Sequence, residues 1–368
     1  MKVDWTQYPL SQELWEVYRN SSRTQRYKFL KDRNLQYARG DVPRCEICNH
    51  GFFNCVCDNE EFQQKRKLQK IEQTKSFDDK LKHSEQMVAD KCDMILRNNL
   101  KVYLAYSGGI DSECCLRLFD SLVRKGTIKV IVGNTLNELP DTYRRIYQAQ
   151  KELGVKFLYA LPERGITFET NAEKFGLPIY PRNNIGKKVD ENIKKPTIKC
   201  CHNLKEKPQA NLTKEFDGNI LGLRANESRA RNMAIKSRGD CHFNNTTGKW
   251  HIRPIAWWTR EDEWNFQKLR GFNYNGIYDK TNIGKIGKYK TSTGRIIDIR
   301  SGCAYCPQGI HQGYLEWLYE FYPKYFEKLV KIYDNVAIKH GDGVDFKKVL
   351  EIKKVKDPRD LKDKSQPF

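Results

Sequence analysis

The stretch Val102-Tyr-Leu-Ala-Tyr-Ser-Gly-Gly-Ile-Asp-Ser112 decides the fold of this chain. Its first five residues are an apolar run of strand formers, and an apolar-periodic segment with Leu116, Phe119 and Leu122 follows Ser112. This pattern predicts a strand, a tight glycine turn and a helix. The two glycines permit a close approach of the backbone to a ligand, and the start of the helix directs free N–H groups to the same place. We therefore expect the loop to hold a phosphate or a pyrophosphate.

Five loop residues are the candidate phosphate contacts, namely Ser107, Gly108, Gly109, Asp111 and Ser112. The loop has neither the Gly-Lys-Ser/Thr ending of a Walker P-loop nor the spaced glycines of a dinucleotide-binding turn. Its Ser-Gly-Gly-x-Asp-Ser form resembles the PP-loop of the ATP pyrophosphatases, the adenine nucleotide α-hydrolase-like superfamily. The alternative is an ordinary glycine-rich turn between a strand and a helix.

Strands and helices alternate after this loop. Residues 128–133 form a second apolar run, residues 142–153 have helical periodicity, and residues 155–162 form a third apolar run. This alternation predicts an α/β fold with a doubly wound, Rossmann-like parallel sheet. Ligands of such sheets bind beyond the carboxyl ends of the strands, where the loops at 107–112 and 134–142 both fall.

Three further segments resemble the 3′-phosphoadenylylsulfate (PAPS) reductase branch of that superfamily, and together the matches cover roughly residues 100–310. Residues 134–143 are similar to its Asn/Asp-Thr-Gly…Pro-Glu-Thr segment, with Leu136 in place of the usual glycine and Asp141 in place of the usual glutamate. Residues 222–231, Gly-Leu-Arg-Ala-Asn-Glu-Ser-Arg-Ala-Arg, look like its Gly-x-Arg-x-x-Glu-Ser-x-x-Arg signature, which ends at Arg231. Residues 251–264 are similar to its Pro-Ile-x-x-Trp helix entry, where Thr259 and Asp262 are spaced as a capping box.

The resemblance implies a site for ATP and Mg²⁺. The catalytic residues that it implies are Asp111 and Ser112 in the loop, with Asp111 orienting the loop or the Mg²⁺ ion, together with Arg224 and Arg229. Guanidinium groups suit phosphate oxygens because they donate two parallel hydrogen bonds. The nucleotide contacts implied outside the loop are Asn134, Thr135, Glu138, Arg224, Glu227, Ser228 and Arg229.

Four cysteines form a CC…CxxC pattern, namely Cys200, Cys201, Cys303 and Cys306. Adjacent cysteines do not easily close a small zinc chelate, but they can take two corners of an iron–sulfur cubane while the CxxC pair takes the other two. The same layout occurs in adenylylsulfate reductases and in the DndC-like DNA phosphorothioation proteins, and this resemblance implies a 4Fe-4S cluster. Zinc and the absence of any metal are the alternatives.

A second group of cysteines lies nearer the N-terminus and consists of Cys45, Cys48, Cys55 and Cys57. A CxxC pair with two more thiols close by can supply the four soft ligands of a structural Zn²⁺ ion. An iron–sulfur centre and the absence of metal are the alternatives here. The remaining cysteines are expected to be small buried hydrophobic residues, namely Cys92, Cys114, Cys115 and Cys241.

The chain has 368 residues and a formal net charge of +20, which favours polyanionic partners, with nucleic acid as the first candidate. It shows no apolar run of transmembrane length and no signal peptide, so we expect a cytoplasmic protein without a membrane partner. We divide it into a helical, cysteine-rich N-terminal extension (1–98), a PP-loop PAPS reductase-like domain (99–310), and C-terminal helices with a charged tail (311–368).

Two departures from the reductases shape the expected function. The loop keeps the form used by ATP-splitting members, and no cysteine follows Cys306 to serve as the reductases' C-terminal nucleophile. We expect an enzyme that adenylates DNA or tRNA, releases pyrophosphate and supports sulfur transfer from a donor such as a cysteine desulfurase. One alternative is a PAPS or adenylylsulfate reductase that produces sulfite, and another is a non-catalytic iron–sulfur protein that binds nucleic acid.

Overall fold

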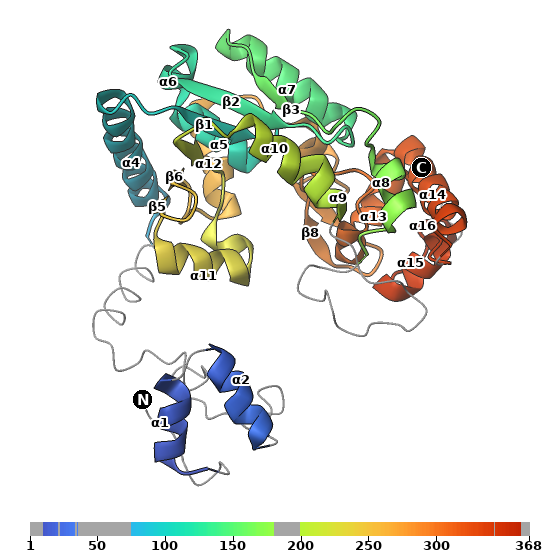
Figure 1. Cartoon of the computed structure of the whole chain (residues 1–368). Helices are drawn as coiled ribbons and strands as arrows, with labels where there is room; N and C mark the ends of the chain where they lie inside the picture. The colour runs from blue at the N-terminus through green and yellow to red at the C-terminus, as the bar shows by residue number, and fades with distance from the viewer. Residues whose placement is uncertain are drawn as a thin grey trace. The chain divides into compact units, whose positions relative to one another are not determined.

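The computed structural model describes residues 10–20, 23–33, 35, 75–179, 199–341 and 343–361. The chain divides into two compact units, Met1–Ser76 and Phe77–Phe368. The first unit contains α1 (Gln12–Asn20) and α2 (Arg23–Asp32) (Figure 1). These helices bury Trp15 and Tyr18 against Phe29, and the three aromatic residues form a small core.

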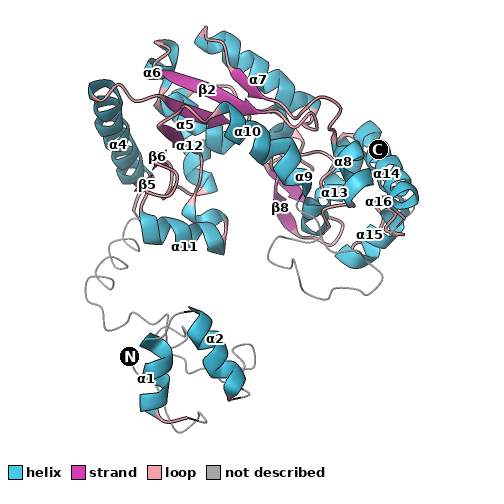
Figure 2. Ribbon diagram, viewed as in Figure 1, coloured by secondary structure: helices cyan, strands magenta, loops and turns pink. Residues whose placement is uncertain are grey.

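A six-stranded sheet in the order β3-β2-β1-β4-β6-β5 organises the second unit (Figures 1 and 2). Its strands are β1 (Val102–Tyr106), β2 (Ile128–Gly133), β3 (Leu158–Ala160), β4 (Gly218–Ile220), β5 (Cys241–Asn244) and β6 (Lys249–Ile252). Strand β1 pairs in parallel with β2 on one side and with β4 on the other, β3 and β6 continue in parallel, and β5 pairs antiparallel with β6. This confirms the predicted α/β fold, and the strand order reverses between β1 and β4, where such sheets bind ligands.

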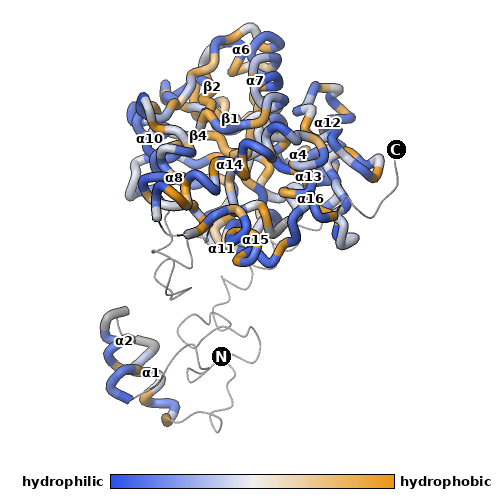
Figure 3. Tube along the Cα trace, turned by 90° about the vertical axis from the view of Figure 1, so that its right-hand side faces the viewer, coloured by the Kyte–Doolittle hydropathy of each residue, from blue (hydrophilic) through white to orange (hydrophobic). Residues whose placement is uncertain are grey.

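Alternate strand residues point to opposite sides of a sheet. In this sheet, apolar residues on both sides are packed against other elements. On one face Leu104 and Tyr106 join the main core, while on the other Tyr103 and Ile131 pack with Leu212 of α10. The helices of this unit up to the end of the sheet are α4 (Phe77–Arg97), α5 (Ile110–Leu118), α6 (Asp120–Arg124), α7 (Pro140–Leu153), α8 (Phe168–Phe175), α9 (Lys199–Cys201), α10 (Lys207–Leu212), α11 (Arg229–Arg238) and α12 (Arg260–Arg270). Figure 3 shows polar and apolar residues alternating along the helix traces, as expected for helices that bury one face.

A small hairpin and a helical region follow the sheet. The hairpin strands are β7 (Lys288–Lys290) and β8 (Ile296–Asp298), and the helices are α13 (Tyr314–Phe321), α14 (Pro323–His340), α15 (Phe346–Lys353) and α16 (Pro358–Leu361). The segment expected to be a charged tail therefore contributes to the core, because Phe346 is buried against Phe326 and Tyr333. In the part of the chain that the structure describes, no helix has the length and apolarity needed to cross a bilayer.

Element boundaries differ from the expected ones at two places. Helix α7 begins at Pro140 rather than Thr142, because proline fits the first helical turn, where no N–H donor is needed. The third strand is limited to Leu158–Ala160, since only these residues pair with the carboxyl half of β2.

Helix α4, expected as part of the N-terminal extension, belongs to the unit that contains the sheet. The predicted zinc ligands Cys45, Cys48, Cys55 and Cys57 lie outside the described residues.

Candidate functional site

The loop between β1 and α5 is held in shape by its own hydroxyl groups. The Ser107 amide donates to Ser112 Oγ at 3.2 Å, and that hydroxyl donates to the Gly109 carbonyl at 2.9 Å. Gly108 has a φ of +70°, a conformation that glycine adopts without strain. Gly109 caps α5 without any side-chain hydrogen bond. The Ile110 amide donates to the Tyr278 hydroxyl at 3.0 Å, so the amides that follow it in the first turn are the ones that an anion could use.

A cavity of about 370 Å³ opens beyond the carboxyl ends of β1, β2 and β4. Its lining includes seven of the residues implied by the resemblance, namely Ser107, Asp111, Ser112, Asn134, Thr135, Glu138 and Glu227. Cavities of a few hundred Å³ at this edge of a doubly wound sheet bind nucleotide-sized ligands. The structure therefore brings the first strand loop and the second strand loop together around one space.

The second strand loop is organised by the carboxylate of Glu138. Glu138 Oε1 accepts hydrogen bonds from the amide and hydroxyl of Thr135 at 3.1 and 2.7 Å, and Tyr143 donates to Glu138 Oε2 at 2.9 Å. The Thr135 hydroxyl also lies 3.4 Å from the sulfur of Cys303. Leu136 has a φ of +60°. The PAPS reductases usually have glycine at this position, and here leucine adopts the left-handed backbone conformation that favours glycine. One loop thus joins the cavity to the CxxC segment.

Asp111 lies within a largely buried cluster of four ionisable groups. Arg224 Nε donates to one of its oxygens at 2.6 Å, and Arg260 Nη1 donates to the other at 3.2 Å. Glu263, with no exposed surface, approaches the same two guanidiniums at 3.0 and 2.9 Å. Neither Glu263 oxygen makes a well-aligned hydrogen bond among the described residues. Both arginines are therefore shared between two carboxyl groups.

The pKa values of the two carboxyl groups move in opposite directions. Burial alone would raise the pKa of Asp111, but Arg260 and Arg224 outweigh it and hold that pKa below its ordinary value. Burial, and then the neighbouring charge of Asp111, raise the pKa of Glu263 well above its ordinary value. The cluster keeps Asp111 ionised and favours a protonated Glu263, so two guanidiniums face one carboxylate beside the cavity. A net positive charge there suits a phosphate ligand.

Other implied residues lie outside the cavity lining. Arg224 is buried behind Asp111 with 3% of its surface exposed, Ser228 accepts a hydrogen bond from the Arg231 amide as the cap of α11, and Arg229 is exposed on that helix. Gly108 and Gly109 shape the loop and are not part of the lining. The cationic residues that do line the cavity are Lys205, Arg231, Arg260 and Arg300. Of these, Arg231 ends the Gly-x-Arg segment, while the other three come from segments without a local signal for this role.

Gly222 fits directly against the loop helix. A Cβ at this position would lie 2.7 Å from the backbone carbon and oxygen of Asp111 and 2.9 Å from the Ser112 amide nitrogen. We expect Gly222→Ala to displace the loop, to lower the free energy of unfolding by about 1–3 kcal/mol and to weaken ATP binding. Thermal unfolding and ATP titration calorimetry measure both effects. Gly133, where a Cβ would meet no atom within 4 Å, is the matched control for stability, and unchanged ATP affinity in Gly222→Ala would contradict this reading of the loop.

The four cysteines of the CC…CxxC pattern come from two segments that meet beside the cavity. Cys200 and Cys201 lie on α9, which continues through a π-helical turn at His202–Glu206, and Cys303 and Cys306 precede Pro307. All four are free thiols. Burial raises the pKa of Cys200, and Cys303, Cys201 and Cys306 raise it further, so the four thiols act on one another electrostatically. Burial and then Cys303 raise the pKa of Cys306 to about 12.

These thiols do not form a site for a single metal ion. Among the described residues, no three His, Cys, Asp or Glu side chains converge closely enough to hold one ion. A cubane spreads its four thiolates over separate iron atoms and so needs a wider arrangement than a mononuclear site. The four cysteines, in two pairs from two segments, are the residues that would hold such a cluster.

Comparisons with known proteins give one family match. A family model described as the phosphoadenosine phosphosulfate reductase domain matches residues 101–308. No curated protein matches the chain in a sequence search. Among solved structures, the chain is similar to the PAPS reductase from Candida auris, with 15% identity, coverage of 59% of this chain and 90% of that one, and a TM-score of 0.40.

Two other solved structures are similar over comparable lengths. An FMN adenylyltransferase from Candida glabrata in complex with ATP has 11% identity, coverage of 62% of this chain and 70% of that one, and a TM-score of 0.37. The U34-tRNA thiolase NcsA from Methanococcus maripaludis with its [4Fe-4S] cluster has 14% identity, coverage of 79% and 81%, and a TM-score of 0.38.

Proposed function

Since the chain belongs to the phosphoadenosine phosphosulfate reductase domain family of the adenine nucleotide α-hydrolase superfamily, we propose that it transfers AMP from ATP to a nucleic acid, either DNA or tRNA. It then supports sulfur transfer to that nucleic acid. The observation that carries the proposal is the cavity at the β1–β4 switch point, where the Ser-Gly-Gly-Ile-Asp-Ser loop faces Arg231, Arg260 and Arg300. The net charge of +20 supports a polyanionic acceptor.

In the proposed reaction, an oxygen of the acceptor attacks the α-phosphorus of ATP. A new P–O bond forms, the bond to the bridging oxygen breaks, and pyrophosphate leaves. The loop amides and the hydroxyls of Ser107 and Ser112 hold the departing pyrophosphate, while Arg260 stabilises the charge that develops on the transferred group. Asp111 fixes Arg260 through a hydrogen bond, and Asp111 and Glu138 are the carboxylates of the cavity lining that would hold the Mg²⁺ accompanying ATP. Hydrosulfide, a sulfur nucleophile that needs no reductant, then attacks the activated atom of the acceptor; a bond to sulfur forms, the bond from that atom to the oxygen that carries AMP breaks, and AMP leaves.

A cluster is part of this proposal. A 4Fe-4S cluster held by Cys200, Cys201, Cys303 and Cys306 would supply a place to bind sulfur next to the nucleotide. The chain's own contribution is positional, since Cys303 belongs to the wall of the nucleotide cavity and Thr135 contacts its sulfur. We therefore expect anaerobically purified protein to be brown.

Replacing one of these cysteines tests the cluster separately from the reaction. We expect Cys303→Ala to lose most of the visible absorption and of the bound iron, because a cubane needs a thiolate at each corner. Cys92→Ala is the matched control, since Cys92 lies on α4 and belongs to neither of the two segments that carry the pattern. Full iron content in Cys303→Ala would rule out this ligand set.

The function is tested by pyrophosphate release from ATP with anaerobically purified protein, measured without nucleic acid, with total tRNA and with DNA. Release that depends on one nucleic acid supports the proposal and identifies the acceptor class.

The second candidate is a PAPS or adenylylsulfate reductase, which the description of the matching family favours. Protein that is inert with ATP but forms sulfite from a sulfonucleotide and a thiol donor is such a reductase. Protein that binds ATP and nucleic acid without releasing either product is a binding protein.

A further inference from the structure

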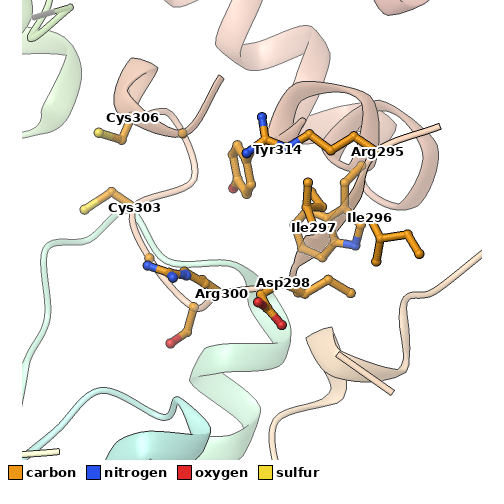
Figure 4. Close-up of a pocket in the computed structure, with 13 residues that line it drawn as sticks. Arg295, Ile296, Ile297, Asp298, Arg300, Cys303, Cys306 and Tyr314 are labelled. Carbon is orange, nitrogen blue, oxygen red and sulfur yellow. The ribbon is translucent and has the colours of Figure 1, made fainter. Parts of the chain in front are cut away.

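A second cavity, of about 420 Å³, lies between β8 and α13 and is separate from the nucleotide cavity. Figure 4 shows Arg295, Ile297 and Tyr314 around it, with the sulfur atoms of Cys303 and Cys306 pointing to the other side. The two cavities share a wall made of Arg300, Ser301, Gly302 and Cys303. A Cβ at Gly302 would meet no atom within 4 Å, so the wall leaves open space at that residue. The second cavity is therefore a neighbour of both the nucleotide and the CxxC segment.

The walls of this cavity are fixed in place. The Ser292 amide donates to Glu316 at 2.6 Å and the Tyr289 hydroxyl donates to Glu320 at 2.8 Å, so the hairpin is bound to α13 along its length. Gly313 at the start of α13 approaches the side chains of Thr291 and Ile297 so closely that a Cβ would not fit. A cavity between anchored elements is preformed, which lowers the entropic cost of binding a ligand.

The lining combines apolar and aromatic surface with unpaired positive charge. Ile297 and Tyr314 are half-buried, and the Tyr314 ring packs on Trp317 with 5.4 Å between ring centroids. Asp298 is the acidic residue of the lining, and Lys288 pairs with it at 2.6 Å. In the described part of the chain, the guanidinium of Arg295 has no ion-pair partner, and Arg300 pairs with Glu227 at 3.6 Å. Arg295 therefore lies unpaired beside the apolar surface, and Arg300 is held only by one long ion pair.

We propose that this cavity is the acceptor subsite and takes one unstacked nucleotide of a single-stranded nucleic acid; the inference rests on the proposed function. The base would lie on Tyr314 and Ile297, since single-stranded nucleic acids are bound by stacking on aromatic rings. The adjoining phosphates would contact Arg295 and Arg300, for which the guanidinium fork is suited. Residues 280–300 support a polyanionic strand at this place, because they carry six Lys or Arg side chains and one acidic side chain.

The proposal is tested by binding of short fluorescein-labelled single-stranded RNA and DNA to the full chain, followed by fluorescence anisotropy at several salt concentrations. We expect Arg295→Ala to weaken binding roughly 10-fold and to reduce the slope of log affinity against log salt by about one. Tyr314→Ala is expected to weaken binding by roughly 10-fold or more with little change in the salt slope. Arg97→Ala removes the same charge from an exposed pair on α4 and is expected to leave binding unchanged.

A second measurement keeps the test independent of any effect of Tyr314→Ala on folding. Iodouracil-substituted RNA or DNA is cross-linked by light to the wild-type protein, and the modified peptide is identified by mass spectrometry. Cross-links to Tyr314 support the proposal. The nucleic acid that forms these cross-links, RNA or DNA, is the class that the subsite binds. If wild type binds nucleic acid but Arg295→Ala behaves like Arg97→Ala and cross-links fall elsewhere, the subsite is wrong while the proposed function stands. If wild type binds neither RNA nor DNA, both are wrong.

Discussion

Asp111→Ala is expected to lower nucleic-acid-dependent pyrophosphate release by about 100-fold or more, the effect of removing a group that preorganises the charges around a reacting phosphoryl group. Asp111 accepts hydrogen bonds from Arg224 and Arg260, and only Arg260 of these two lines the cavity. Without the carboxylate, Arg260 keeps only its contact with Glu263, at 2.9 Å. The guanidinium would then be held by one carboxyl group instead of two, and its position next to the transferred phosphoryl group would be less well fixed.

Two further variants separate charge from shape. Asp111→Asn keeps the size of the side chain and loses its charge, so a loss of rate as large as that in Asp111→Ala shows that the charge matters. Asp120→Ala removes a carboxylate from an exposed pair with Arg124 on α6 and is expected to leave the rate unchanged. Thermal unfolding of each variant shows whether the protein assayed is folded. A folded Asp111→Ala protein with the wild-type rate would disprove the proposed role.

The pH dependence of stability follows from the same cluster. Because the pKa of Asp111 is lowered on folding, its contribution to stability is present above its unfolded pKa and is lost as the pH falls through the folded value. The pKa of Glu263 is raised, so its contribution is present at low pH and is lost as the pH rises through its folded value. The two carboxyl groups therefore limit stability from opposite ends of the pH scale.

The sequence was sufficient for features that local patterns determine. The strand–turn–helix of the loop is found where the apolar run, the glycines and the helical periodicity placed it, with α5 beginning at Ile110. The capping box of Thr259 and Asp262 also forms as the spacing predicted, because a cap depends only on residues three apart. Patterns of this range need no knowledge of the rest of the chain.

The site charges depend on contacts between distant segments, which local patterns do not contain. Arg260 follows Thr259 in a segment whose sequence pattern predicts only the start of a helix. It reaches Asp111 because this segment follows β6, which lies next to β4 in the sheet. Arg300 comes to the cavity from the connection after β8. Arg224 matches a signature, yet it is buried between Asp111 and Glu263, since two buried carboxyl groups need positive charge nearby.

Arg145→Met is expected to lower the free energy of unfolding by about 3–5 kcal/mol, the usual effect of removing one partner of a buried ion pair. Arg145 and Glu113 are each 1% exposed, and Arg145 donates to both oxygens of Glu113, at 2.8 and 3.1 Å. Arg145 also contacts Glu152 at 2.8 Å, and Tyr106 of β1 donates to Glu113 at 2.5 Å. The network joins α5, which begins at the loop, to α7 and to the sheet.

Removal of the arginine leaves the Glu113 carboxylate with Arg117 and Tyr106 alone, and methionine fills the volume without replacing the charge. Urea unfolding followed by circular dichroism measures the loss. Arg144→Ala is the matched control one residue away, since Arg144 is 66% exposed in its pair with Asp141, and such pairs contribute about 0–1 kcal/mol. The double variant with Glu113→Gln should recover part of the loss, because the isolated charge is what costs free energy. Equal stabilities for Arg145→Met and Arg144→Ala would show that this network does not hold the loop helix in place.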